Sequence, residues 1–305
     1  MKFDILGAGS LGLLWAGRLA RAGYDVRLLL RNKDALRAWE SIGNRLTLEQ
    51  DGVAQQLQIN AILCSAEEPL NHLIVATKAY AVPAALTSLA NRLDPQNTVV
   101  MLQNGLGSQQ YATDLCPNQQ VLWASVTDGA WMAAPGHVVW AGKGITRIGD
   151  DSGGERPTWL QMLTPDALEW QWEPRISRVL WQKLAINCAI NPFTAIFDCP
   201  NGQVPARAGA DLTALITELQ MLLRSQGCLI EATELPNTLV QVIHKTAANS
   251  SSMRQDLHAR RRTEIDFILG HACRTAARQG LEVPAMQRLY AALKTHLAMH
   301  GLPTN

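Results

Sequence analysis

This chain has little net charge, no closely spaced cysteines and no long apolar runs. Its 305 residues carry a formal net charge of +1 and its Lys and Arg residues are scattered, which argues against nucleic acid or an anionic membrane as the main partner. No apolar run is long enough to span a membrane, and the first apolar residues are needed for a strand rather than a signal peptide. We therefore expect a cytoplasmic protein with neither a nucleic-acid nor a membrane partner.

The cysteines are too far apart in sequence to form a recognisable metal site or redox pair. There is no Cys-x-x-Cys motif and no His grouping at metal-ligand intervals, so we expect free thiols and no metal. The six positions are Cys64, Cys116, Cys188, Cys199, Cys228 and Cys273. With 47% hydrophobic and 17% charged residues, and no internal repeat, the chain is long enough for two globular domains.

The most informative motif lies near the start of the sequence. A short apolar strand leads directly into the glycine motif Gly7-x-Gly9-x-x-Gly12. The first glycine of such a motif permits a sharp turn, the second lets backbone N–H groups approach a pyrophosphate, and the third lets the next helix pack closely. Glycine-rich loops are often only loops. Here an apolar helical stripe over residues 11–22 and an apolar strand over 26–30 follow, which favours a dinucleotide site.

An acidic residue is missing from the end of that second strand. A carboxylate there normally binds the adenosine ribose hydroxyls of NAD, but the chain has Arg31, followed by Asn32 and Lys33. Positive charge and amide donors suit a 2′-phosphate, so the sequence favours NADP(H) over NAD(H). The alternative is that Arg31 is only a solvated surface arginine.

Apolar runs further along the chain continue the pattern of a doubly wound sheet. Strand-like runs at 73–76 and 98–102 flank an expected helix over 82–93. From about residue 129 the chain has short strands at 138–140 and 145–148 separated by glycines, which we interpret as a meander closing the first domain.

Beyond about residue 174 the pattern is helical. Helices are expected near 175–190, 205–227, 235–249, 262–280 and 284–300. The predicted fold class is an α/β Rossmann-type doubly wound N-terminal domain over residues 1–173, followed by an all-α C-terminal domain over residues 174–305.

One polar stripe interrupts an otherwise apolar helix. Lys183, Asn187 and Asn191 are spaced at i, i+4 and i+8, so they share one helix face. A solvated face normally mixes charges of both signs, whereas this one has a single lysine and two amides. The alternative is that the asparagines bond only to neighbouring backbone and that Asn191, before Pro192, ends the helix.

Other polar residues lie where open α/β sheets bind ligands or beside apolar residues. Lys78 and Asn104 each follow a predicted parallel strand, at its carboxyl end, although Asn104-Gly105 is also a common turn. Glu264 and Asp266 flank an apolar run. Thr263 with Asp266 resembles a helix-capping box, so we expect Asp266 to serve the fold and Glu264 to be the site candidate.

Several stretches, in order and across the whole chain, resemble the ketopantoate reductase (2-dehydropantoate 2-reductase) family. They are Gly7-Ala8-Gly9-Ser10-Leu11-Gly12, Thr77-Lys78-Ala79-Tyr80, Gln103-Asn104-Gly105-Leu106-Gly107, residues 183–196, Cys199-Pro200-Asn201-Gly202 and residues 251–266. The resemblance implies a Rossmann domain followed by a helical domain, with the active site in the cleft between them. It also implies NADPH-dependent reduction of the 2-keto acid ketopantoate to pantoate, on the route to pantothenate and coenzyme A.

The resemblance assigns a role to each polar residue. Lys183 would stabilise charge on the keto oxygen and donate the proton, and Glu264 would be its catalytic partner and accept a hydroxyl. The implied substrate contacts are Lys183, Asn187, Asn191, Asn201, Ser252 and Gln255. With Arg31, the implied NADP(H) contacts are Gly7, Ala8, Gly9, Ser10, Leu11, Gly12, Lys78, Asn104, Ala130 and Glu264. Ala130 lies where this chain carries a small insertion relative to the family.

Two other functions share these features. The first is reduction of a different 2-keto acid, but a substrate without a terminal hydroxyl would leave some of the asparagine, serine and glutamate groups unpaired. The second is an NADPH-sensing protein without turnover, which would have no need of a proton donor at Lys183. The helical periodicity fits a monomer and a homodimer equally well.

Overall fold

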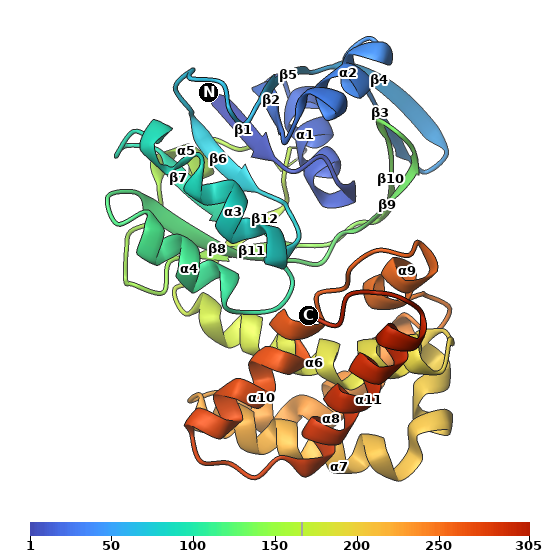
Figure 1. The fold of residues 1–305 in the computed structure, drawn as a ribbon. Coiled ribbons are helices and arrows are strands. Elements are labelled where there is room, and N and C mark those ends of the chain that lie inside the picture. Colours follow the sequence, from blue (N-terminus) through green and yellow to red (C-terminus); the bar gives the residue numbers. More distant parts are fainter. Residues whose placement is uncertain (166) are drawn as a thin grey trace. The chain divides into compact units, whose positions relative to one another are not determined.

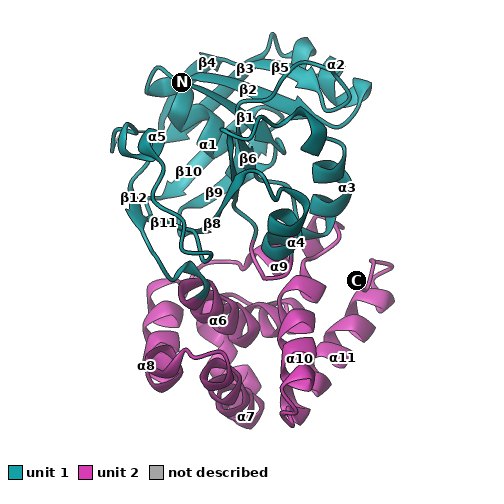
Figure 2. Cartoon of the chain, turned by 90° about the vertical axis from the view of Figure 1, so that its left-hand side faces the viewer, with its two compact units in different colours: residues 1–103, 108–177 teal, residues 104–107, 178–305 magenta. Residues whose placement is uncertain are grey.

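The computed structural model describes residues 1–165 and 167–305 (Figure 1). Their contacts divide the chain into two compact units, residues 1–103 with 108–177 and residues 104–107 with 178–305 (Figure 2). Residues 104–107 therefore group with the second unit although they follow a strand of the first. Within the described ranges, every helix is too short or too polar to cross a lipid bilayer.

The first unit is built on an eight-stranded sheet. All its neighbouring strands are parallel except β8 and β11. In spatial order they are β12 (Trp170–Trp172), β11 (Thr146–Gly149), β8 (Gln120–Val126), β7 (Thr98–Met101), β6 (His72–Val75), β1 (Lys2–Leu6), β2 (Asp25–Leu30) and β5 (Asn60–Leu63). The strand order runs outward in both directions from β1, which confirms the predicted doubly wound sheet.

Both faces of this sheet are buried, because its strands send apolar side chains alternately to each side. On β6, Ile74 belongs to one core cluster, while Leu73 and Val75 belong to another. The first cluster includes the buried Leu14 and Trp15 of α1 (Ser10–Arg21), and the second includes Val82 and Leu86 of α3 (Val82–Thr87). The remaining helices of the unit are α2 (Lys33–Ser41), α4 (Ser108–Leu115) and α5 (Thr158–Gln161).

The predicted meander is wrong. A separate four-stranded sheet has the order β4 (Val53–Gln58), β3 (Arg45–Gln50), β10 (His137–Gly142) and β9 (Gly129–Ala134). Thus the strand at 138–140 pairs with β3 and β9, whereas the strand at 145–148 returns to the main sheet beside β8. Gly144 permits this return, because a Cβ there would lie 2.3 Å from the carbonyl carbon of Thr127.

The expected helix over 82–93 is also too long. The α-helix ends at Thr87, and a short 3-10 turn follows at Ala90–Arg92. The Thr87 and Ser88 hydroxyls donate to the carbonyls of Pro83 and Ala85. Such local side-chain bonds compete with helix propagation, which explains the early end.

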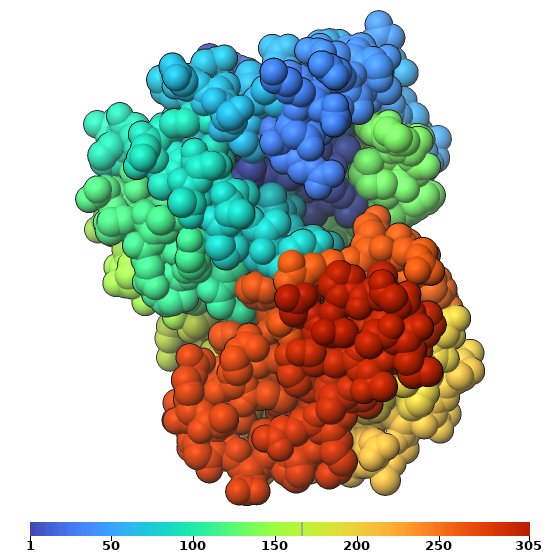
Figure 3. Space-filling view, viewed as in Figure 1, coloured from blue at the N-terminus to red at the C-terminus, as the bar shows by residue number. Residues whose placement is uncertain are grey.

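The described part of the second unit is helical, as predicted, with different boundaries. Its helices are α6 (Ile176–Ile196, entering from the first unit), α7 (Val204–Ser225), α8 (Leu229–Lys245), α9 (Ser252–His258), α10 (Leu269–Arg278) and α11 (Pro284–Met299). Helix α6 continues through Pro192, and α9 was not predicted. The helix expected near 262–280 consists of a 3-10 turn at Ile265–Phe267 and α10, because Ile268 has a non-helical ψ of −91°. Figure 3 shows α10 and α11 on the viewer's face of this unit.

Candidate functional site

The glycine loop has the geometry that the motif predicts. Gly7 adopts φ +110°, and a Cβ at Gly12 would lie 1.9 Å from the Gly7 carbonyl oxygen, so α1 packs directly on the turn. At Gly9, by contrast, a Cβ would meet nothing within 4 Å. Gly9 is also the N-cap of α1 and provides no side-chain cap. The helix N-terminus therefore faces open space with its N–H groups uncapped by a side chain, as an anion site requires.

Arg31 directly follows β2 and is exposed. None of the carboxylates in the described ranges pairs with it, so its guanidinium is available to a ligand. Asn32 has a structural task, because its side chain accepts a hydrogen bond from the backbone N–H of Ala35 and caps α2. This bond uses the amide oxygen of Asn32 and not the Nδ2 donor expected to contact a 2′-phosphate.

Lys78 lies after the end of β6 and is half-buried. The neighbouring strand ends are tied together by Gln103, whose Nε2 donates to the carbonyl oxygens of Val75 and Thr77 at 2.9 and 3.1 Å. These two bonds hold the segment that carries Lys78 at the carboxyl edge of the sheet. This is the position that the sequence predicted for Lys78, and open α/β sheets bind ligands at this edge.

Ala130 lies in β9, in register with Trp140 of β10, and the turn before it is fixed by a buried carboxylate. One Asp128 oxygen accepts from Arg18 at 3.2 Å, from Trp140 Nε1 at 2.8 Å and from Gly144 N–H at 3.1 Å. The Arg18 and Asp128 side chains are 2% and 0% exposed. This network could not be predicted from the sequence, because the Arg18–Asp128 pair joins residues 110 positions apart and no local motif marks it.

In the second unit, α6 presents the predicted polar stripe. Lys183 and Asn187 are half-buried and Asn191 is 7% exposed. The helix continues past Asn191 to Ile196, so the alternative in which Asn191 ends the helix is wrong. One cationic group and two amides thus line one face of a helix whose other neighbours are apolar.

Lys183 and Glu264 are electrostatically coupled. Burial lowers the pKa of Lys183 to about 8, and the negative charge of Glu264 opposes that fall. Glu264 itself is only 6% exposed. A partly desolvated ammonium beside a carboxylate is typical of catalytic acids and bases, because its pKa lies near neutral pH.

Asn201 begins a 3-10 turn and is largely buried, at 9% exposure. Its Nδ2 donates to Thr246 Oγ1 at 3.0 Å. Its Oδ1 is buried and has no hydrogen-bond donor among the described residues. An unsatisfied buried acceptor destabilises the fold by about 1–3 kcal/mol, so this atom is a candidate acceptor for a ligand hydroxyl.

Ser252 and Gln255 both lie on α9 and are exposed. The helix is capped by Ser251, which accepts from the backbone N–H of Arg254, while Gln255 Nε2 donates to the Ser250 carbonyl. The expected capping box at Thr263 is wrong: the Thr263 hydroxyl is buried without a partner among the described residues. Asp266 serves the fold, as predicted, by accepting from the hydroxyl of Tyr290.

Asn104 begins the loop that groups with the second unit. Leu106 N–H donates to the Phe267 carbonyl at 2.8 Å, and a Cβ at Gly105 would lie 2.4 Å from the same oxygen. The Asn104 loop is thereby packed on the turn that follows Glu264. Asn104-Gly105 is therefore both a tight turn, with Gly105 at φ +81°, and a candidate site element.

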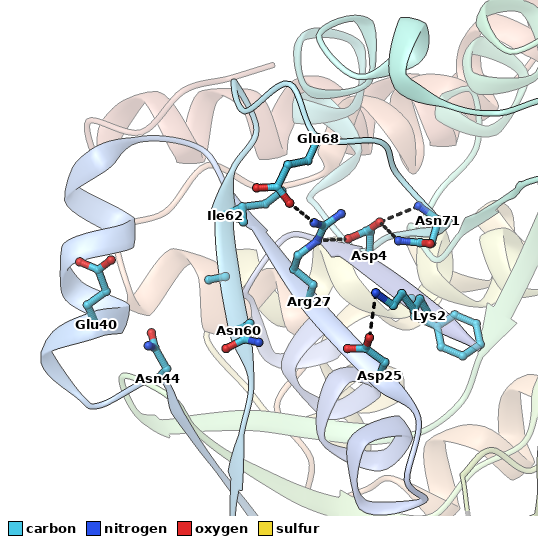
Figure 4. A pocket seen from close by; sticks show the side chains of 12 residues that line it. Lys2, Asp4, Asp25, Arg27, Glu40, Asn44, Asn60, Ile62, Glu68 and Asn71 are labelled. Atoms are coloured by element: carbon cyan, nitrogen blue, oxygen red, sulfur yellow. Dashed lines mark hydrogen bonds and ion pairs between the residues drawn. The ribbon is translucent and has the colours of Figure 1, made fainter.

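The cavity in Figure 4 lies at the other edge of the main sheet. It is lined by residues at the beginnings of β1, β2 and β5, such as Lys2, Asp25 and Asn60, whereas the glycine loop follows the end of β1. Most of its charges are paired with one another: Lys2 with Asp25, and Arg27 with Asp4 and Glu68. It is therefore separate from the dinucleotide site. Among the described residues, no cluster of His, Cys, Asp or Glu side chains is suited to a metal ion.

A doubly wound unit that opens on a glycine loop, followed by a helical unit with a desolvated lysine beside a glutamate, defines a dinucleotide-binding oxidoreductase class. The family models place the chain more narrowly. The model "Ketopantoate reductase PanE/ApbA" matches residues 3–153, and the model of its C-terminal part matches residues 175–297. The chain belongs to the ketopantoate reductase family.

Named relatives agree with this assignment. The chain is 35% identical over 301 residues to a 2-dehydropantoate 2-reductase of Vibrio cholerae, covering 97% of both, and 32% identical to one of Yersinia pestis, covering 96% of this chain and 94% of the relative. A PanE/ApbA family ketopantoate reductase structure from Ralstonia eutropha has a TM-score of 0.86 at 27% identity, over 99% of this chain and 100% of that one. D-mandelate dehydrogenase with NADH and anilino(oxo)acetate has a TM-score of 0.89 at 20% identity, with the same coverage, and shares the fold.

Proposed function

We propose that the chain catalyses the NADPH-dependent reduction of 2-dehydropantoate to pantoate, a step toward pantothenate and coenzyme A. The observation that carries this proposal is the coupled pair of Lys183, with its pKa lowered to about 8, and Glu264. The pair occurs in a chain that is similar over nearly its full length to proteins named 2-dehydropantoate 2-reductase.

The first unit offers the features that NADP(H) needs. Open space at Gly9 and the uncapped N-terminus of α1 suit a pyrophosphate, and the exposed Arg31 guanidinium suits a 2′-phosphate. We therefore assign cofactor binding to the domain over residues 1–173, including Lys78, Asn104 and Ala130, with a further contact from Glu264. When bound, NADPH supplies the hydride that adds to the C2 carbonyl carbon of the keto acid.

Lys183 provides the complementary proton. As the C2 carbon gains hydride, negative charge develops on the keto oxygen, and the Lys183 ammonium stabilises it and transfers a proton to it. The product is the 2-hydroxy acid, and the neutral amine regains its proton from solvent. A pKa of about 8 keeps Lys183 mostly protonated at neutral pH, yet makes it a stronger acid than an ordinary lysine.

The helical domain over residues 174–305 orients the substrate. Asn187, Asn191 and Ser252 offer neutral donors to the carboxylate, which leaves the lysine for the keto oxygen. The Oδ1 of Asn201 lacks a donor among the described residues, and the terminal hydroxyl of 2-dehydropantoate can donate a hydrogen bond to it. A keto acid without that hydroxyl would leave the acceptor unpaired, which favours 2-dehydropantoate over simpler 2-keto acids.

The loss of NADPH absorbance tests both substrate and cofactor. We expect fast turnover of 2-dehydropantoate and slow turnover of pyruvate and 2-ketoisovalerate. We also expect preference for NADPH over NADH, which Arg31→Ala should reduce by about 1.5–3 kcal/mol, the value of a charge-assisted hydrogen bond. Turnover of another 2-keto acid alone would reassign the substrate. Saturable NADPH binding without any turnover would support a sensor instead.

A further inference from the structure

Two hydroxyl groups join α6 to α9 in the interior of the second unit. Thr194 Oγ1 lies 2.8 Å from the Asn191 carbonyl oxygen and 2.7 Å from Ser251 Oγ. The backbone N–H of Arg254 donates to the same Ser251 oxygen at 3.1 Å. Thr194 is 0% exposed and Ser251 6%, so water cannot readily replace any partner in this chain.

The direction of each hydrogen bond in this series is fixed by the groups at its two ends. A carbonyl oxygen can only accept, so the Thr194 hydroxyl donates to Asn191. Thr194 Oγ1 must then accept from Ser251, whose oxygen in turn accepts from Arg254 N–H. Each hydroxyl donates once and accepts once, and removal of either one leaves a buried group unsatisfied.

A second contact joins the same two segments at the surface. Asp198, two residues after α6, accepts from Arg254 Nε at 2.7 Å and contacts His258 Nε2 at 2.6 Å. Asp198 adopts φ +44°, a left-handed conformation that is strained for a non-glycine residue. We call Thr194, Asp198, Ser251 and Arg254 together the α6–α9 clasp.

Helix α9 depends on such contacts for its position. It has seven residues, fewer than an isolated helix needs to persist in water. Helix α6 is weakened locally as well, because Pro192 provides no N–H to the carbonyl four residues earlier. The clasp thus stabilises two weak points, one beside Asn191 and the other beside Ser252.

We propose that Thr194 is a positioning residue that sets the spacing between the Asn191 and Ser252 groups, and so the fit of the keto acid's carboxylate. Thr194 touches neither substrate nor cofactor in this proposal and acts through its bonds to Asn191 and Ser251. The inference rests on the proposed function, because it assigns the two groups to the same substrate.

Thr194→Val tests the inference, because it keeps the shape and removes the hydroxyl. We expect the KM for 2-dehydropantoate to rise about tenfold, the effect of one misplaced hydrogen bond, with kcat and the Kd of NADPH unchanged. Thr194→Ser should restore the KM. Thr113→Val is the matched control, because Thr113 in α4 also donates to a helix carbonyl, that of Gln109, and accepts from Trp123 Nε1, but lies in the first unit.

Each result separates positioning from general stability. An unchanged KM in Thr194→Val, or an equal rise in Thr113→Val, would overturn the inference while leaving the proposed function intact. A wild-type chain without keto-acid turnover would overturn both. Should Thr194→Val not fold, Asp198→Ala loosens the clasp at a carboxylate that is 62% exposed; it should raise the same KM, and no rise there would also refute the proposal.

Discussion

At the scale of single residues, Lys183 must remain charged in an environment that disfavours charge. Burial lowers its pKa to about 8, and in the proposed mechanism only the ammonium can give the keto oxygen a proton. We therefore expect kcat for reduction to be level below about pH 8 and to fall tenfold per pH unit above it, as the amine loses its proton. Steady-state rates between pH 6 and 10 with both substrates saturating would measure this profile.

Substitutions at Lys183 provide the control for that profile. Lys183→Ala should lower kcat by about 10²–10⁴-fold, the usual contribution of a general acid, and the decline above pH 8 should disappear. Glu264→Gln removes the charge that opposes the lowered pKa, so the decline should begin at a lower pH. A Lys183→Ala enzyme with the wild-type pH profile would show that another group donates the proton.

The residue-level predictions succeeded where a local pattern carried them. The spacing of Lys183, Asn187 and Asn191 was enough to place them on one helix face, and Arg31 could be placed from the strand before it. The Thr194–Ser251 bond could not be predicted, because it joins residues 57 positions apart and both are ordinary residues for a helix end. The Thr263 capping box failed because the chain forms a 3-10 turn there, with no side-chain cap.

At the scale of elements, strongly apolar segments were predicted well and polar or short ones poorly. Strands β6 and β7 are buried almost throughout, and their apolar residues are consecutive in the sequence. Strand β4 is almost fully exposed and α9 has only seven residues, so neither has a strong hydrophobic period. The pairing of β10 with β3 is a long-range contact that no local pattern contains.

The Asn104 loop offers a test at this scale. Gly105 has φ +81°, and a Cβ there would lie 2.4 Å from the Phe267 carbonyl oxygen. We expect Gly105→Ala to lower the free energy of unfolding by more than the ~1–2 kcal/mol of left-handed strain alone, because backbone atoms must also move. Since Asn104 would move with the loop, kcat/KM should fall as well. Urea unfolding and steady-state kinetics would measure the two effects.

Gly153→Ala is the matched control for this loop. Gly153 has nearly the same φ, +85°, but a Cβ there meets nothing within 4 Å. In this variant the free energy of unfolding should therefore fall only by the cost of the left-handed backbone strain, and kcat/KM should stay at the wild-type value. Equal destabilisation in the two variants would mean that the Phe267 backbone moves at little energetic cost and does not fix the position of the loop.

At the scale of the whole molecule, the chain passes between its two units three times, after residues 103, 107 and 177. The sequence predicted two successive domains from composition and periodicity. Composition and periodicity describe consecutive stretches of sequence, so they do not reveal a four-residue loop that groups with a distant segment. The loop brings Asn104, which follows the sheet, into the same unit as Glu264 and Lys183.

The proposed cofactor contacts in both units lead to a prediction for the intact chain. Hydrogen exchange with and without saturating NADPH should show protection at residues 9–13 of the first unit, where the cofactor phosphates are proposed to bind. It should also show protection at residues 104–107 and 264–268 of the second unit, where the nicotinamide end is proposed to bind. Protection confined to the first unit would contradict the roles proposed for Asn104 and Glu264.

Adenosine 2′,5′-bisphosphate supplies the control, because it carries the 2′-phosphate but no nicotinamide. It should protect residues 9–13 and leave 104–107 and 264–268 exchanging as in the free chain. Arg31→Ala should weaken this ligand and NADPH by the same factor, because both place a 2′-phosphate beside the guanidinium. If the bisphosphate protected the second unit as strongly as NADPH does, the protection there would reflect general tightening of the chain, and direct contact between the nicotinamide and Asn104 would lose its support.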